Sequence, residues 1–314
     1  MNRVVVTGGA GFIGSGLVRA LLADGVKHVA VVDNLLSGKE ENLAEVRDRI
    51  EFHNADIRDH AAMRRIFEGA DVVFHLAAIP SVPRSIQDPL PSHDVNINGT
   101  FTVLSAASEA KARRVVYAAS SSAYGDTLVL PKVETMLPKP NSPYALQKLA
   151  GEYYGSVFHK CFGLEFVALR FFNVFGPRQD PSSAYSGVLS LFMKCLIERK
   201  APVIFGDGEQ SRDFTYVDDV AALVIKAAKA DGVAGNVYNA GNGNRYTLNF
   251  IWSQLQAIEG VHIPATFGPP REGDVRDSQA DTALAIKELG HDPKFPIDIA
   301  LKLTLDWYKK SISA

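Results

Sequence analysis

The chain has few cysteines, little net charge and no long apolar run, and each of these absences excludes a class of protein. Its two cysteines, Cys161 and Cys195, stand at no spacing used for metal or paired-thiol chemistry, so we expect a reducing compartment and no metal. No apolar run approaches the length of a membrane span. The opening Met1–Val6 segment is followed too soon by glycine to be a signal peptide, so we expect a cytoplasmic protein.

The charge balance argues against polyanionic partners. Thirty-three basic and 35 acidic residues give a net charge of −2, which provides no general attraction to nucleic acid or to an acidic membrane. We therefore expect neither as a partner. Any anion must therefore be bound by local arginines.

The order of apolar segments predicts an α/β fold. With 314 residues, 46% of them hydrophobic and 22% charged, the chain can form one large domain or two unequal ones. Short apolar runs alternate with longer amphipathic stretches, which predicts a doubly wound parallel sheet of the Rossmann type with its ligand crevice at the carboxyl ends of the strands. The expected strands are Arg3–Val6, His28–Val32, Ile50–His53, Val72–His75, Arg114–Ala118 and Glu165–Phe171. The expected helices are Phe12–Ala23, Glu41–Asp48, Ala61–Glu68, Ser92–Ala110 and Tyr144–Phe162.

The regular alternation ends after Gly176-Pro177. A helix near Val217–Ala230 and a strand at Asn236–Asn239 follow, and the remaining pattern is irregular. We therefore predict a nucleotide-binding domain made of residues 1–176 and 213–242. A smaller, discontinuous substrate domain is expected from residues 177–212 and 243–314.

The first expected strand leads into a glycine-rich turn. Gly8, Gly11 and Gly14 stand at G-x-x-G-x-x-G spacing, directly before a helix. Glycines at this spacing let the backbone turn tightly and approach a pyrophosphate at the helix N-terminus. A glycine pattern alone is weak evidence, but its position between a strand and a helix makes a dinucleotide site the favoured interpretation.

Residues at the ends of the next strands complete the expected cofactor site. Asp33 ends the second strand, where an acid binds the adenosine ribose hydroxyls and repels a 2′-phosphate, so NAD is favoured over NADP. The structural alternative is that Asp33 only forms a turn. Asp56 and Ile57 are placed to frame the adenine, and the small residues in Leu76–Ala78 allow close approach to the dinucleotide. His75 is expected to be a packed strand-end residue rather than a catalyst.

The pair Tyr144 and Lys148 is the strongest indication of chemistry. Ser142 suits a helix N-cap and Pro143 the first helical position, so a helix should begin just before Tyr144. Residues four apart on a helix face the same way, which puts the ammonium beside the phenol. Lowering the phenol pKa from about 10 to about 7 needs roughly 4 kcal/mol, which a cation, the helix dipole and a bound nicotinium ring can supply together. By itself, the spacing also fits an exposed lysine at the start of an amphipathic helix.

Three serines follow the fifth expected strand. Ser120, Ser121 and Ser122 stand at the edge of the sheet where Tyr144 should also arrive. A serine hydroxyl there can bridge the phenol and a substrate oxygen. Serines at strand ends also form turns, and we favour that role for Ser121 and Ser122.

Taken together, these motifs resemble the extended short-chain dehydrogenase/reductase family. Within it, the chain is most similar to the UDP-sugar 4-epimerases, in particular those acting on UDP-N-acetylglucosamine. The resemblance implies that Ser120 is the catalytic hydroxyl, Tyr144 the base and Lys148 its partner. Dehydratases of the family carry two acidic residues at the positions that Ser121 and Ser122 occupy in this chain, and decarboxylases carry a glutamate at the position of Ser122. Both activities are therefore disfavoured. The similarity covers nearly the whole chain, including the segments Val95–Thr100, Arg170–Arg178, Gly206–Phe214 and Arg271–Arg276.

The resemblance also implies a reaction and a set of contacts. Tyr144 takes the proton of the sugar 4-hydroxyl while C4 gives hydride to NAD, the 4-keto sugar turns over, and hydride returns to its other face. A homodimer through Ser92–Ala110 and Tyr144–Phe162 is implied as well. The implied NAD contacts are Gly8, Gly11, Phe12, Ile13, Gly14, Asp33, Asn34, Asp56, Ile57, Leu76, Ala77, Ala78, Asn96, Tyr144 and Lys148. The implied UDP-sugar contacts are Ser81, Arg84, Ser120, Ser121, Ser122, Tyr144, Asn173, Val188, Arg212, Arg271, Asp274 and Ser278, with Arg212 and Arg271 suited to the diphosphate.

The identity of the sugar depends on two features. Ser278 falls where epimerases restricted to plain hexoses resemble one another in carrying tyrosine, and a small residue leaves room for a 2-acetamido group. The Ser81–Ile86 loop also resembles enzymes of N-acetylated sugars, with Arg84 and Ser85 placed to contact the sugar or to cap the loop. We therefore expect interconversion of UDP-GlcNAc and UDP-GalNAc. The alternatives are a relaxed UDP-glucose/UDP-galactose epimerase, a UDP-glucuronate epimerase in which Arg84 faces the carboxylate, a non-catalytic NAD sensor, and Ser278 as a plain turn residue.

Overall fold

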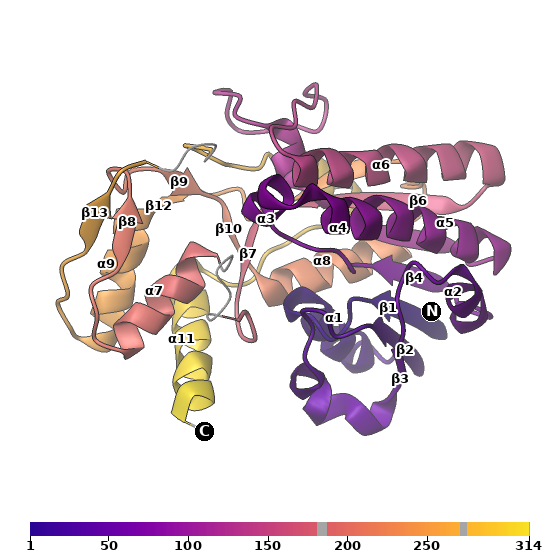
Figure 1. The fold of residues 1–314 in the computed structure, drawn as a ribbon, viewed down its shortest axis with the longest axis horizontal. Coiled ribbons are helices and arrows are strands. Elements are labelled where there is room, and N and C mark those ends of the chain that lie inside the picture. Colours follow the sequence, from indigo (N-terminus) through magenta and orange to yellow (C-terminus); the bar gives the residue numbers. More distant parts are fainter. Residues whose placement is uncertain (181–186, 271–274, 314) are drawn as a thin grey trace.

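A seven-stranded parallel sheet forms the centre of the larger part of the molecule (Figure 1). The computed structural model describes residues 1–180, 187–270 and 275–313. The strand order is β11-β6-β5-β4-β1-β2-β3, and every neighbouring pair is parallel, which confirms the expected doubly wound sheet. The strands are β1 (Arg3–Thr7), β2 (His28–Asp33), β3 (Ile50–Asn54), β4 (Val72–His75), β5 (Arg114–Ser120), β6 (Glu165–Phe171) and β11 (Val237–Ala240).

Strand β5 is longer than predicted, and the difference matters for the site. The sequence predicts an end at Ala118, but pairing with β6 continues until Ser120 lies opposite Phe171. The ladder therefore carries Ser120 to the carboxyl edge of the sheet as part of a regular strand. A residue in such a ladder is held more firmly than one in a turn.

Alternate residues of the strands face two helical layers. Val4 and Val6 of β1 pack with α1 and α8, whereas Val5 packs with α2 and α5, as the two-residue period of a strand requires. Both faces of the central strands β1, β4 and β5 are buried, which explains why these strands are largely apolar, whereas the edge strand β3 is more polar and only partly buried. The helices of this part are α1 (Phe12–Ala23), α2 (His60–Ile66), α3 (Val82–Gln87), α4 (Pro89–His93), α5 (Thr100–Glu109), α6 (Pro143–Phe162), α8 (Val217–Lys229) and α10 (Ala283–Leu289).

Three of the expected helices differ in detail. The stretch Ser92–Ala110 is not one regular helix, because a π-helical turn, Asp94–Gly99, separates α4 from α5. The stretch near Glu41–Asp48 is a 3-10 helix, Glu40–Arg49. Helix α2 is shorter than predicted and begins at His60, because the Asp59 side chain accepts a hydrogen bond from Ala62 N and caps the helix there.

A separate apolar core lies beside the sheet. Phe192 of α7 and Trp252 of α9 meet edge to face at 5.4 Å, and Leu305 of α11 is buried with them. Figure 1 shows these helices grouped with β8 and β13 on the side of the molecule opposite the sheet. The elements of this part are β7 (Asn173–Phe175), α7 (Val188–Ile197), β8 (Val203–Phe205), β9 (Ser211–Arg212), β10 (Phe214–Tyr216), β12 (Tyr246–Thr247), α9 (Leu248–Glu259), β13 (Thr266–Gly268) and α11 (Ile297–Ser313). Among the described helices, none has both the length and the apolar character needed to cross a membrane.

Candidate active site

The glycine-rich turn between β1 and α1 is packed against its own backbone. A Cβ added at Gly14 would lie 2.0 Å from Gly8 O, so only glycine fits this position. Gly8 has a φ of 72°, and a Cβ there would lie 2.7 Å from Ala77 N. Within the described residues, no side chain caps the N-terminus of α1 at Gly11, so its first N–H groups are available to an anion. The turn therefore fits the pyrophosphate of a dinucleotide.

Asp33 connects this turn to the end of β2. Its carboxylate accepts hydrogen bonds from Ala10 N at 3.0 Å and from Leu35 N at 2.9 Å. The side chain is only 8% exposed, and burial raises its pKa. The bond to Leu35 N is the contact expected if Asp33 forms a turn. The bond to Ala10 N also connects Asp33 to the glycine-rich turn. The ribose role of Asp33 stays a prediction.

The ends of β2 and β3 also meet. Asn34 donates from Nδ2 to Asp56 Oδ2 at 3.1 Å, and Arg58 binds both oxygens of Asp56. The hydrogen bonds from Arg58 lower the Asp56 pKa to about 2. Ile57 is buried beneath this cluster. The predicted adenine-side residues therefore lie together, and their contacts with NAD stay predictions.

The segment after β4 lies beside the glycine-rich turn, and its contact with the dinucleotide stays a prediction. Leu76 N bonds to Thr7 O, and the position of Ala77 N against Gly8 brings Leu76–Ala78 alongside the glycine turn. His75 is fully buried, with Nδ1 2.8 Å from Thr7 Oγ1 and Nε2 3.0 Å from Thr100 Oγ1. These contacts confirm that His75 is a packed strand-end residue.

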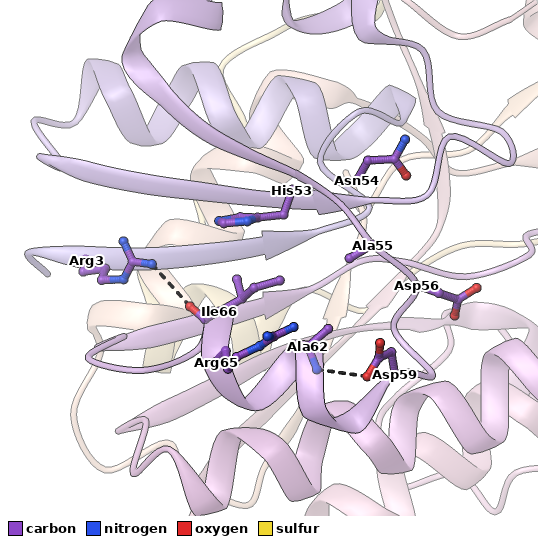
Figure 2. A pocket seen from close by; sticks show the side chains of 9 residues that line it. All are labelled: Arg3, His53, Asn54, Ala55, Asp56, Asp59, Ala62, Arg65 and Ile66. Atoms are coloured by element: carbon purple, nitrogen blue, oxygen red, sulfur yellow. Dashed lines mark hydrogen bonds between the residues drawn. The ribbon is translucent and has the colours of Figure 1, made fainter.

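A shallow pocket of about 700 Å³ lies elsewhere, between the edge strand β3 and α2 (Figure 2). Its walls carry both positive and negative side chains and include none of the three predicted catalytic residues. Asp56 lies at one end of it, so the pocket touches the adenine side of the predicted cofactor site. It is lined by Arg3, His53, Asn54, Ala55, Asp56, Asp59, Ala62, Arg65 and Ile66.

Helix α6 begins as the sequence predicts and presents Tyr144 in its first turn. Ser142 caps the helix by accepting from Ala145 N at 3.2 Å, and Pro143 occupies the first turn. Tyr144 N donates to Ser85 Oγ at 3.1 Å, and Ser85 is fully buried in α3. Ser85 therefore positions the backbone of Tyr144. The sequence indicated a sugar contact or loop cap for Ser85 and gave no sign of this role.

Lys148 lies one turn further along α6 and points to the end of β5. Its Nζ donates to Ala118 O at 2.8 Å and lies 4.9 Å from the centre of the Tyr117 ring. The residue is 4% exposed. An ammonium has three donors, so the bond to Ala118 leaves two for other partners. Lys148 is thus fixed two residues before Ser120 on the same strand.

The pKa of the Tyr144 phenol is not lowered as expected. The pKa of the Lys148 ammonium is lowered instead. Burial raises the pKa of Tyr144 to about 12, and a hydrogen bond with the Ser120 hydroxyl only partly opposes this. Burial lowers the pKa of Lys148 to about 7, against the attraction of Glu152. In the protein alone, the loss of water therefore has a larger effect on the Tyr144 pKa than the hydrogen bond with Ser120. Further positive charge, such as a nicotinium ring, is needed to make Tyr144 a base at neutral pH.

The three serines after β5 form a compact turn. Ser120 Oγ accepts from Ser122 N at 3.2 Å and lies 2.8 Å from Ser122 Oγ. Ser121 and Ser122 begin a 3-10 turn that ends at Tyr124. The predicted turn role is confirmed for both, and Ser122 additionally contacts the hydroxyl expected to be catalytic.

Asn96 anchors the loop after β4 to α6. It bonds Ile79 N through Oδ1 at 2.8 Å, and its Nδ2 donates to Gln147 Oε1 at 2.8 Å. Gln147 in turn donates to Ser92 Oγ at 3.1 Å. Asn96 thus holds the loop after β4 in place, and any direct NAD contact stays a prediction. Gln147 was not singled out from the sequence; its only signal was its place next to Lys148.

The predicted substrate residues lie on several separate elements. Ser278 N donates to Ser211 O at 3.1 Å, which places Ser278 beside β9 and Arg212. Arg212 donates from Nη1 to Arg276 O at 2.8 Å. Asn173 is exposed at the start of β7, and Val188 is the first residue of α7. Ser81 caps α3 by accepting from Arg84 N at 3.0 Å, and the Arg84 side chain is half-buried. Arg271 and Asp274 lie outside the described residues.

Asp213 is a structural residue that the sequence analysis did not single out. It is fully buried, and its carboxylate accepts from Ala280 N, Asn242 N and Gly243 N at 2.8 to 3.0 Å. Burial raises its pKa against these bonds. Asp213 therefore ties the strand after Arg212 to the loop that carries Ser278. The only indication of this role in the sequence was the position of Asp213 within the Gly206–Phe214 segment.

Comparison with known proteins identifies the family. The model of the NAD dependent epimerase/dehydratase family matches residues 4–241. The chain belongs to this family. It is 38% identical over 311 residues to a UDP-glucose 4-epimerase of Mycolicibacterium smegmatis, covering 98% of each chain.

Solved structures of the epimerase/dehydratase family share the whole fold. A UDP-N-acetylglucosamine 4-epimerase from Methanobrevibacter ruminantium, in complex with UDP-N-acetylmuramic acid, gives a TM-score of 0.94 at 38% identity and covers 99% of both chains. A UDP-glucose 4-epimerase from Thermotoga maritima with UDP-glucose gives 0.94 at 38% identity and covers 99% of this chain and all of that one. NAD is the cofactor of this family, and the uncapped helix α1 and buried Asp33 fit it.

Proposed function

We propose that the protein epimerises a UDP-hexose at C4 with NAD, acting on UDP-GlcNAc and UDP-GalNAc. The observation that carries the proposal is the meeting of Tyr144, Lys148 and Ser120 at the end of β5, next to the glycine turn. Lys148 Nζ bonds Ala118 O on β5, and Ser120 at the end of the same strand is close enough to Tyr144 to lower the pKa of the phenol in part, so one strand end organises all three groups. Relatives that match along nearly their whole length include several named as UDP-sugar 4-epimerases, and one is named as a dTDP-glucose 4,6-dehydratase.

Each of these side chains has a distinct part in the reaction. Tyr144 accepts the proton of the 4-hydroxyl and later returns it, and Ser120 bridges the phenol and the substrate oxygen. The Lys148 ammonium stabilises the phenolate. When bound, NAD supplies the hydride acceptor and then the hydride donor, so it ends each cycle unchanged. We assign the sheet part of the chain, which includes α10, to NAD, and the rest of residues 177–212 and 243–314, around the separate apolar core, to the UDP-sugar.

The N-acetylated substrate is supported by Ser278 and by one of the solved relatives. Ser278 is a small residue that lies beside β9, and the Methanobrevibacter ruminantium enzyme is named for UDP-N-acetylglucosamine. The Mycolicibacterium smegmatis and Thermotoga maritima relatives are named for UDP-glucose, so relaxed specificity is the second candidate. A UDP-glucuronate epimerase needs a cation at the sugar carboxylate, for which Arg84 is the candidate. The non-catalytic NAD sensor is disfavoured because the whole catalytic set is present.

A panel of UDP-sugars tests the proposal with the wild-type chain and Ser278→Tyr. We expect the wild type to interconvert UDP-GlcNAc and UDP-GalNAc, measured by chromatography of the products. Ser278→Tyr fills the acetamido space, so the kcat/KM ratio of UDP-GlcNAc to UDP-galactose should fall about 10-fold to 100-fold. Equal loss on both sugars would contradict the gate. Stoichiometric NADH without epimer would replace the epimerase by a net dehydrogenase, and no product at all would favour the sensor.

We also propose a homodimer through α5 and α6. Phe101, Tyr153, Val157 and Phe162 leave between 46% and 63% of their surface exposed on these two helices. An exposed apolar face of this kind is typical of a subunit interface.

The dimer has a simple test. Val157→Glu places a charge in this face and should convert the protein to a monomer in sedimentation or light scattering. Leu303→Glu is the matched control, because Leu303 is a similarly exposed apolar residue on α11, and it should leave the assembly unchanged. A wild-type chain that is monomeric at micromolar concentration would refute the proposal.

A further inference from the structure

A buried ion pair stands behind Lys148. Arg170 of β6 donates to the Glu152 carboxylate from Nε at 3.0 Å and from Nη2 at 2.8 Å, and both residues are 4% exposed. Two buried charges lose much of their hydration, so such a pair persists only with good geometry and additional partners. The two-point contact supplies that geometry. The mechanism described above does not use either residue.

The pair is built into the same structure as the catalytic groups. Glu152 lies one turn beyond Lys148 on α6, just as Lys148 lies one turn beyond Tyr144. Arg170 is paired with Ala119 in the sheet. Ala119 lies between Ala118, whose carbonyl oxygen bonds Lys148, and Ser120.

Further contacts hold the arginine. Its guanidinium lies 4.6 Å from the centre of the Tyr124 ring. The Tyr124 hydroxyl is fixed in turn by a 2.6 Å bond to Asn239 Oδ1. The guanidinium is therefore held by a strand, an aromatic ring and a carboxylate, and it has little freedom to move away from Glu152.

The other groups around Lys148 are neutral at pH 7. Tyr117 of β5 lies under the ammonium, and burial holds its pKa well above the usual value. His75 of β4 is buried, and its pKa is lowered to about 3. Tyr144 on the same helix keeps its proton in the protein alone. Within the described surroundings of Lys148, the attraction that favours its charged form comes from Glu152.

We propose that Glu152 and Arg170 are positioning residues that set the charge of Lys148. The carboxylate favours the protonated form of Lys148 and so opposes the effect of burial. The guanidinium holds both carboxylate oxygens and so prevents Glu152 from pairing directly with Lys148. The two free donors of the ammonium then remain available at the catalytic end of the site. The consequence for turnover rests on the proposed epimerase function, whereas the effect on Lys148 does not.

The test uses opposite charge changes in the NAD-loaded protein. Glu152→Gln removes the negative charge and leaves Arg170 positive, so the pKa of Lys148 should fall by about one unit or more. Arg170→Met leaves Glu152 unpaired, so the same pKa should rise. Carbon-13 NMR of lysine labelled at Cε reports this pKa directly, with the Lys148 signal assigned by its loss in Lys148→Met. The alkaline limb of the activity profile should move in the same two directions.

Controls separate this role from support of the fold. Glu165→Gln removes a partner from the buried Arg114 at the amino ends of the same two strands, and it should leave the Lys148 pKa unchanged. If Glu152→Gln does not fold, the double variant Glu152→Gln/Arg170→Met should still show a lower Lys148 pKa than Arg170→Met alone. Shifts in the same direction, or no shift, in the two single variants would overturn the proposal. Because the NMR titration needs no turnover, an inactive protein with opposite shifts would refute only the proposed function.

Discussion

Tyr144→Phe is expected to reduce epimerase turnover about 10³-fold or more while NAD stays bound. The substitution removes the group that accepts the sugar proton, and a positioned acid or base contributes about 10² to 10⁴ in rate. It leaves the ring, the Tyr144 N bond to Ser85 and the cap of α6 in place. Steady-state kinetics with UDP-GlcNAc, together with the NAD content of the purified variant, measures the effect.

Tyr154→Phe provides the matched control for this variant. Tyr154 lies on the same helix and meets Phe101 edge to face at 5.5 Å, away from the end of β5. Loss of its hydroxyl should leave kcat within about twofold of the wild type. If Tyr144→Phe retained a tenth or more of the wild-type rate, the base would have to be sought elsewhere.

Gly14→Ala is expected to weaken NAD binding about 100-fold or more. The added Cβ would lie 2.0 Å from Gly8 O and 2.8 Å from Gly9 Cα, so the glycine turn itself must move. Displacing a packed backbone costs about 3 kcal/mol or more, and the moved turn no longer aims its N–H groups at a pyrophosphate. Titration of NAD into stripped protein gives the affinity, and thermal unfolding gives the loss of stability.

Gly16→Ala makes the same chemical change two residues later in α1. There the added Cβ would lie 3.3 Å from Val217 Cγ2, so that side chain would have to move by only a few tenths of an ångström. Alanine also favours a helix over glycine by about 1 kcal/mol, so this variant should bind NAD normally and be no less stable. Equal NAD affinity in Gly14→Ala and the wild type would show that the turn does not contact the cofactor.

Much of the fold follows from local sequence signals. The apolar strands, the glycine turn and the Ser142–Pro143 helix start each depend on neighbours in the chain, and each was predicted close to its observed position. The extension of β5 to Ser120 was not, because it depends on a pairing with β6 that lies about 50 residues away. The expected reactive residues were recognised from their types and spacing.

The contacts between segments that are distant in the chain could not be predicted from the sequence. Ser85 bonds the backbone of Tyr144, and Arg170 bonds Glu152, across 59 and 18 residues. The pKa order of Tyr144 and Lys148 likewise depends on how deeply the finished fold buries them. Spacing on one helix indicates which groups face one another, but not how much water surrounds them.

The π-helical turn Asp94–Gly99 changes the sequence spacing between residues of α4 and α5 that face the same way. A π-helical turn contains one more residue than an α-helical turn. The residues that follow it are therefore offset by about 100° from the positions they would have in an uninterrupted α-helix. The outward position of Phe101 on α5 therefore cannot be found by counting heptads from α4. Deleting a single residue within Asp94–Gly99 would remove the π-helical turn and restore a regular α-helix, and Phe101 would keep its outward position.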